Sequence, residues 1–220
     1  MSSVVVSGDT SGSITISAPA VSGTNTLTLP VATDTLVGKA TTDTLTNKSI
    51  VASQLTGTVA AARLPAGSVI QVVSVIKSDT FTTSSASLVD VTGLTVSITP
   101  ASASNKVLVL VQVNGSQDVA ANRTYLRLLR GGTTINAGDV ASLRLPIFGS
   151  LASPADSIFS ASAAGMYLDS PATTSSTTYK IQVASAAGSG TCCINRSDQD
   201  NDEVGQGRAA STITLMEIQG

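Results

Sequence analysis

The densest group of side chains that could do chemistry is an acidic run near the C-terminus, formed by Asp198, Asp200, Asp202 and Glu203. The alternating aspartates match the start of a calcium-binding loop, which offers oxygen ligands at positions 1, 3 and 5. The match ends at position 6, where glutamate stands in place of glycine, and at position 12, where Ala209 replaces the bidentate glutamate. The sequence therefore predicts neither a metal site nor any other cofactor here.

We interpret the acidic run as a solvated loop between strands that we expect near Thr191 and Ser211. Exposed loops are where recognition residues tend to lie, because a rigid scaffold can hold them without packing constraints. We predict that the four acidic side chains form an exposed contact surface.

Catalytic groups are scarce. The chain has no histidine, which excludes a Ser-His-Asp triad and a Cys-His pair, and no glycine-rich phosphate loop is present. A depolymerase with paired carboxylates needs only acids such as Asp139, Asp156 and Asp169, but sugar sites usually add aromatic platforms, and the chain has no tryptophan and three tyrosines. We expect a non-catalytic protein whose aspartates bond local turn backbone, with a polysaccharide depolymerase as a remote alternative.

Basic residues do not form a stripe. The net charge is −2 and the twelve lysines and arginines are scattered, so we expect no nucleic-acid partner. Arg123, Arg127, Arg130 and Arg144 could form a modest basic region, either as donors at a subunit interface or as a weak receptor patch. No signal segment and no run of 18 apolar residues is seen, so we expect no membrane insertion.

The composition favours an all-β fold. Charged residues make up 12% and aromatic residues 3% of the chain, while 42% of residues are hydrophobic, enough to fold. Much of the apolar content is β-branched and threonine is abundant, which suits pleated strands. The only cysteines, Cys192 and Cys193, are adjacent, so they cannot make an unstrained disulfide with each other and are interpreted as small buried or half-buried residues.

The first 67 residues differ from the rest of the chain. Short strand candidates at Val4–Val6, Ser13–Ser17 and Thr26–Leu29 are separated by turn residues, which predicts a small β-segment over residues 1–35 that anchors the chain.

Residues 36–67 carry sparse aliphatic side chains that fit neither a helix nor a strand period: Leu45, Ile50, Leu55, Val59 and Leu64. One chain cannot bury them, but three copies wound about a common axis can, which predicts an intertwined stem. A flexible linker rich in serine and threonine is the alternative.

Residues 68–220 have the pattern of a β-sandwich. Leu94–Thr99 alternates apolar and hydroxylated residues as a half-buried strand does, and Tyr179, Ile181 and Val183 are expected to face the core. Val107–Val113 is apolar on both faces, so it is expected to lie centrally or with one face against a neighbouring subunit. Eight to ten such strands predict a jelly-roll-like knob.

Several longer strings resemble those of a known family. SGDTSGSITISAPAVSGTNTLTLP (Ser7–Pro30), DTLTNKSI (Asp43–Ile50) and QLTGTVAAARLP (Gln54–Pro65) resemble the N-terminal and stem elements of tailed-bacteriophage fibre and virion proteins. DVTGLTVSITPASASNKVLV (Asp90–Val109) and INRSDQDNDEVGQGRAASTITLMEI (Ile194–Ile218) resemble the β-rich head that follows such stems.

This resemblance implies a homotrimeric virion structural protein that is assembled in the host bacterial cytoplasm and exposed on the particle surface. Its N-terminus would dock to another virion protein, and its distal C-terminal knob would contact a host receptor or glycan. A tail fibre or spike for host attachment is the leading interpretation, and a capsid head fibre or decoration protein is the alternative.

Overall fold

The computed structural model describes residues 3–7, 10–17, 24, 49–51, 53, 56–152, 158–186 and 188–220. Apart from one short 3₁₀ turn, η2 (Ala61–Arg63), the regular elements of these residues are β-strands, which confirms the all-β prediction. No helix in this part of the chain is long and apolar enough to cross a membrane. The chain divides into two units, residues 1–56 and 57–220.

The first unit contains an antiparallel hairpin of β1 (Ser3–Ser7) and β2 (Ser13–Ser17), as predicted. Val4, Val5 and Val6 are all more than half exposed, so the hairpin buries little by itself. An isolated two-stranded hairpin is only marginally stable in water. The strand predicted at Thr26–Leu29 lies outside the described residues.

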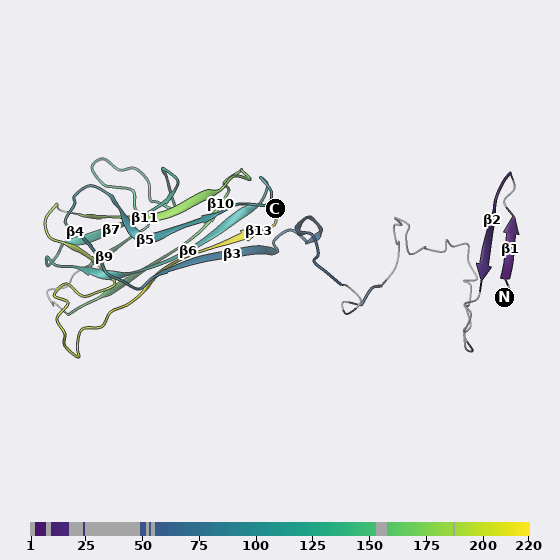
Figure 1. The fold of residues 1–220 in the computed structure, drawn as a ribbon. Helices are drawn as coiled ribbons and strands as arrows, with labels where there is room; N and C mark the ends of the chain where they lie inside the picture. The colour runs from purple at the N-terminus through teal and green to yellow at the C-terminus, as the bar shows by residue number, and fades with distance from the viewer. Residues whose placement is uncertain are drawn as a thin grey trace. The chain divides into compact units, whose positions relative to one another are not determined.

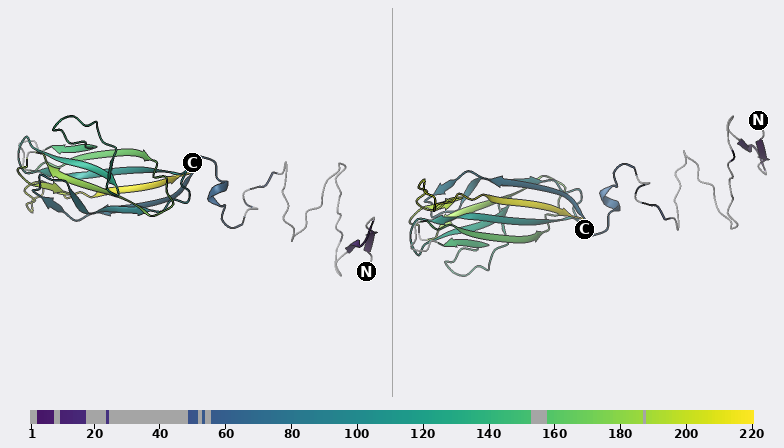
Figure 2. Two further views of the ribbon diagram at one scale, coloured as in Figure 1. Left: turned by 90° about the horizontal axis from the view of Figure 1, so that it is seen from above. Right: turned by 90° about the horizontal axis from the view of Figure 1, so that it is seen from below.

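The second unit contains two antiparallel sheets, which Figures 1 and 2 show stacked against each other. The first sheet is formed by β3 (Val69–Lys77), β4 (Phe81–Thr83), β6 (Lys106–Gln117), β10 (Ala161–Asp169), β12 (Cys192–Ile194) and β13 (Ser211–Ile218). The second is formed by β5 (Val89–Ile98), β7 (Arg123–Arg130), β8 (Thr133–Ile135), β9 (Gly149–Ala152) and β11 (Thr177–Ser185).

The pairing register arranges the first sheet into four rows. Along Val107–Gln112, β6 pairs with both β13 and β10, so these two strands lie on its opposite edges. Gly115 pairs with both β10 and β12, which puts β12 on the same edge as β13. The rows are therefore β3 with β4, β13 with β12, β6, and β10, in that order.

The second sheet also has four rows: β5, β11, β7, and β8 with β9, because β8 and β9 pair with successive stretches of the same edge of β7. The chain changes sheets at each connection between rows except the turn from β7 to β8. That turn uses Gly131, whose φ of 57° lies in the left-handed region that favours glycine.

The core lies between the two sheets. It joins inward side chains such as Val109 and Leu215 of the first sheet to Leu94, Leu126 and Ile181 of the second, all fully buried. Tyr179, Ile181 and Val183 face this core as predicted. The prediction that Val107–Val113 lies centrally is also confirmed, since β6 is an inner row with Leu108 and Leu110 on its outer side.

Two strands were not predicted, and the strand predicted at Leu94–Thr99 begins earlier. Phe81–Thr83 and Gly149–Ala152 are short strands held by longer partners. Val89–Ile98 is a single strand, although its register with β11 shifts between Lys180 and Gln182. Gly93, with φ of 88°, lies in the stretch of β5 where that shift occurs.

The sandwich has two distinct ends. At one end the N–H of Gly67 donates to the carbonyl of Gln219 over 2.8 Å, and the N–H of Gln219 donates to the carbonyl of Ser68 over 2.9 Å. The segment that precedes β3, which we call the leader, therefore enters the sandwich beside the C-terminus (Figure 2). At the other end lie the loops 84–88, 118–122 and the described part of 186–191. Their contacts include a bond from the Ser185 N–H to the Ser85 carbonyl.

Candidate contact surfaces

The predicted acidic loop is the connection between β12 and β13, and Asn195 fixes its root. The Asn195 side chain is fully buried, and its Nδ2 donates to the carbonyls of Lys77 and Asp79, each over 2.8 Å. Its Oδ1 accepts a hydrogen bond from the Ser211 hydroxyl over 2.6 Å. Asparagine tolerates the left-handed backbone found here, with φ of 64°. The loop therefore leaves the first sheet from a rigid point.

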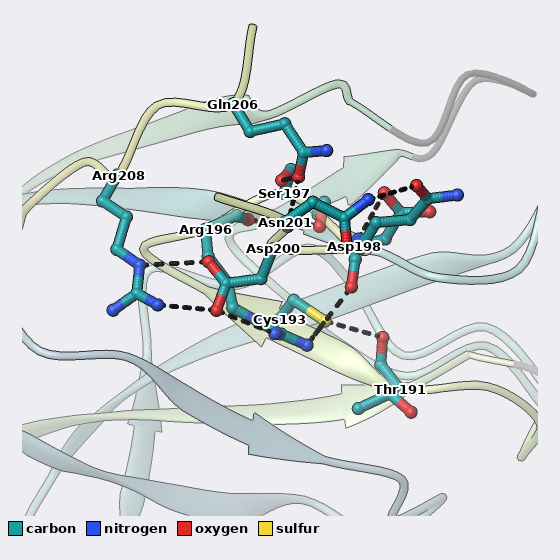
Figure 3. A network of polar contacts seen from close by, with 11 residues as sticks. Thr191, Cys193, Arg196, Ser197, Asp198, Asp200, Asn201, Gln206 and Arg208 are labelled. Carbon is teal, nitrogen blue, oxygen red and sulfur yellow. Dashed lines mark hydrogen bonds and ion pairs between the residues drawn. The ribbon is translucent and has the colours of Figure 1, made fainter. Parts of the chain in front are cut away.

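Within the loop, two arginines hold Asp200 (Figure 3). Arg208 donates to both carboxylate oxygens, over 3.0 and 2.7 Å, and the Arg196 guanidinium lies 3.2 Å from the same carboxylate. Partial burial by itself would raise the pKa of the Asp200 carboxyl, but the arginine hydrogen bonds and charges outweigh it and the pKa lies below its ordinary value. Asp200 is thus an internal structural group of the loop.

A second set of bonds closes the loop from Gln206. Its Oε1 accepts from the Ser197 hydroxyl and from the Asn201 N–H, each over 2.9 Å (Figure 3). The Nε2 of Gln206 and the Nε of Arg196 are buried and have no acceptor among the described residues. The loop is therefore held by side-chain contacts rather than by a strand ladder.

The four predicted contact residues lie on this one loop but are not equally exposed. Asp198 is half-buried and its Oδ1 accepts the Gln199 N–H, while Asp200 is ion-paired. Asp202 and Glu203 are exposed, and next to them Val204 is fully exposed. Of the four predicted residues, the two exposed acids are therefore available for recognition, together with a valine that the sequence reasoning did not single out.

The cysteines below the loop are unreactive. Both are free and fully buried, as the sequence predicted. Burial is the main cause that raises the pKa of the Cys192 thiol and of the Cys193 thiol, and the nearby Arg196 offsets it only in part for Cys193. A protonated buried thiol is a poor nucleophile.

The central part of the outer side of the first sheet carries no charged side chain, and we call this surface the uncharged face; the exposed Lys106, at the start of β6, lies beyond it on the same side. Directly paired residues of neighbouring strands project to the same side of a sheet. The uncharged face comprises twelve positions: Val72, Ser74, Ile76, Thr212, Thr214, Met216, Leu108, Leu110, Gln112, Ala164, Met166 and Leu168.

Large apolar groups of the uncharged face are open to solvent. Val72, Ile76, Met166 and Leu168 have exposed fractions between 48% and 69%. The largest contiguous apolar patch on a protein surface is often a contact site. A hollow of about 460 Å³ lies across β13, β6 and β10, where Thr214, Leu110 and Ala164 are among its lining residues.

The outer side of the second sheet has a different chemistry, and we call it the charged face. Its residues include Asp90, Thr178, Lys180, Gln182 and Arg127. Asp90 accepts from Lys180 and from Gln182, each over 2.7 Å. These bonds, that of Lys180 foremost, lower the pKa of Asp90 below its ordinary value.

The four arginines of the predicted basic region have separate surroundings. Arg127 donates to the Pro146 carbonyl over 3.1 Å, and Arg123 donates to the Asn122 carbonyl over 3.4 Å. Arg130 is engaged in an ion pair with Asp169, and Arg144 is exposed.

The aspartates considered for a depolymerase also differ. Asp169 is buried and accepts from Arg130 over 2.7 and 2.9 Å and from the Tyr179 hydroxyl over 2.6 Å. The expectation that it bonds local turn backbone is therefore wrong: it joins β10 of the first sheet to β7 and β11 of the second. Burial, followed by the Asp169 hydrogen bond, raises the pKa of Tyr179 well above its ordinary value. Asp139 is exposed, and Asp156 lies outside the described residues.

A second buried acid was missed by the sequence reasoning. Glu217 is fully buried, and its carboxylate accepts from Asn105 Nδ2 and Gln71 Nε2 over 2.5 Å each and from the Ala101 N–H over 2.7 Å. Burial alone would raise its pKa, but the hydrogen bonds lower it below the ordinary value. The donors come from distant parts of the chain, so no local sequence signal identifies this site.

The predicted stem residues are only partly covered by the structure. Ile50 and Val59 are about half exposed and Leu64 is half-buried, while Leu45 and Leu55 lie outside the described residues. Among the described residues, no three or more histidine, cysteine, aspartate or glutamate side chains are grouped so as to hold a metal ion. Comparison with protein-family models and with curated protein sequences gives no match for this chain.

Proposed function

We propose that this chain is a non-catalytic structural protein of a bacteriophage particle, a homotrimeric tail fibre or spike that contacts the host surface. Residues 1–35 attach it to another virion protein, residues 36–67 form the stem, and residues 68–220 form a jelly-roll knob. The family resemblance of the sequence motivates the particle location, and the contacts of the sandwich support the roles of its two ends.

The jelly-roll assignment is supported by the row order of the sheets. A jelly roll has eight strands in two sheets, with connections that pass repeatedly from one sheet to the other. Here each sheet has four rows, and every connection between rows except that from β7 to β8 changes sheets.

The observation that carries the proposal is the polarity of the sandwich. The leader and the C-terminus are hydrogen-bonded together at one end, while the loops 84–88 and 118–122 and the described part of 186–191 lie at the other. A domain held by its leader presents those loops outward, where recognition residues tend to lie. The exposed side chains Asp202, Glu203 and Val204 add a lateral contact surface.

Immunogold labelling of intact particles with antibodies against the sandwich tests this proposal. Labelling at the tail is the expected result, and labelling distributed over the capsid would support the head fibre or decoration protein instead. Particles without label and without this chain in their mass spectrum would contradict both. Release of reducing ends from host polysaccharide by the purified protein would support the depolymerase.

The contact role of the acidic loop is tested by phage adsorption. We expect particles that carry D202N together with E203Q to adsorb to host cells at a clearly reduced rate. D198N is the control, because Asp198 is half-buried within the same loop. Equal adsorption of all three particles would remove the loop from the proposed contact surface.

A further inference from the structure

We infer that the uncharged face packs against further copies of this chain, three of them around one axis. The inference rests on the proposed homotrimer and names the surface that joins its knobs. It concerns residues Val72–Ile76, Leu108–Gln112, Ala164–Leu168 and Thr212–Met216, which lie within four adjacent rows of one sheet.

The first argument is the exposed apolar area. Val72, Ile76, Met166 and Leu168 are 48–69% exposed. A partner that covers their exposed apolar surface removes it from water, which is favourable by about 25 cal/mol per Å². The hollow beside Thr214 and Met166 is a depression into which side chains of a partner can pack.

The second argument identifies the occupant as the same chain. A partner recognised by charge would need opposite charges, and the uncharged face offers none, whereas a copy of the face meets it without repulsion. Two of its three hydroxyls are already paired, since Ser74 and Thr214 share a hydrogen bond of 2.8 Å. Burying this pair leaves neither hydroxyl without a partner, so the desolvation cost is small.

The third argument concerns the number of copies. Four rows spaced about 4.8 Å apart make a sheet about 19 Å wide. Three such sheets set as a triangular prism have their axis about 5.5 Å from each sheet, close to half of the roughly 10 Å between packed sheets. Side chains from three copies can therefore fill the space about the axis, with β3 of one copy beside β10 of the next.

The area of the face is consistent with a contact that also uses the sheet edges. Five residues along each of four rows give a footprint on the order of 350 Å². A standard interface buries about 800 Å² per partner, so the edges of β3 and β10 must supply much of the rest.

A matched pair of substitutions in the full chain tests the inference. Thr214 lies on the uncharged face and Thr178 on the charged face, both are half-buried, and each pairs with a serine hydroxyl of the neighbouring strand over 2.8 Å. Light scattering during serial dilution should give a wild-type mass of about 66 kDa, three times the 22.0 kDa chain. We expect T214E to raise the concentration of half-dissociation at least about tenfold and T178E to leave it unchanged.

A second variant guards against misfolding. Met166 is 69% exposed in the single chain, so M166E should keep the wild-type circular dichroism while weakening the trimer as T214E does. A wild-type trimer that neither T214E nor M166E weakens would overturn the inference and leave the proposed homotrimer intact. A wild-type dimer would overturn the threefold arrangement, and a wild-type monomer would overturn both it and the proposed homotrimer. The particle location is tested separately by labelling.

Discussion

On the outer side of the second sheet, Lys180 and Gln182 bond Asp90, whereas on the outer side of the first sheet Leu110 lies between Thr214 and Met166. Both sides contain a Ser–Thr hydroxyl pair at 2.8 Å, so strand-forming residues are common to both. The difference is the charge. An antiparallel sheet commonly packs one side on the core and leaves the other in water, and the uncharged face is the side that the inferred contact between copies would bury.

The largest effect should come from breaking the sheet that carries the uncharged face. A Cβ atom added at Gly115 would lie 2.1 Å from the backbone oxygen of Cys193, where β6 passes β12. We expect G115A to lower the free energy of unfolding by at least about 3 kcal/mol, because backbone must move.

The control for G115A is G132A, in the turn of the other sheet, where an added Cβ meets nothing within 4 Å. Urea denaturation of the two variants measures the difference. Equal midpoints would mean that β6 and β12 are not packed as described.

The next effect concerns the ion pair that joins the two sheets. R130A leaves the buried Asp169 carboxylate without its cation, and we expect a loss of about 3 kcal/mol in the free energy of unfolding. R127A is the control, since Arg127 bonds only the Pro146 carbonyl among the described contacts, and should cost less than about 1 kcal/mol. If the two substitutions cost the same in urea titrations, Asp169 does not depend on Arg130.

The smallest effect is pH-dependent and contrasts a buried with an exposed carboxylate. The folded-state pKa of Glu217 is lowered, so the unfolded chain binds more protons and stability falls as pH falls below about 4.3, through the folded pKa. We expect E217Q to lower the free energy of unfolding by about 2 kcal/mol near pH 7, because the amide N–H groups of the new glutamine would face N–H donors. The substitution should also flatten the acid slope, which is the fall in stability as the pH falls.

D90N on the charged face is the comparison for E217Q. The pKa of Asp90 is also lowered, so its contribution fades in the same direction, but its side chain is half exposed and the effect should be small and weakened by salt. Thermal unfolding between pH 3 and pH 7 in low and high salt measures both. An acid slope that E217Q leaves unchanged would show that folding does not lower the pKa of Glu217.

Much of the fold was predictable from period-two patterns. Leu94–Thr99 and Tyr179–Val183 alternate because one side faces the core, and the structure places them so. Val107–Val113 was predicted as a strand that is apolar on both sides, and its outward leucines belong to the uncharged face. Phe81–Thr83 and Gly149–Ala152 escaped prediction because strands of three or four residues are decided by their partners rather than by their own pattern.

The sites were less predictable than the strands. The acidic loop was placed correctly between β12 and β13, yet the pairing of Asp200 with Arg196 and Arg208 depends on the folded path of the loop. The partners of Asp169 and Glu217 come from other strands and connections, up to 146 residues away for Glu217. Sequence spacing carries no information on such contacts without a known topology.

The leader continues directly into β3, an edge strand whose partner in the sheet is β13, antiparallel from Val69 to Lys77. When the loops at the far end are held and the leader is pulled, the force runs along β3. The hydrogen bonds to β13 lie across that direction and are loaded in shear together rather than opened one after another. The same pairing that shapes the sheet would thus resist a force applied through the segment that precedes β3.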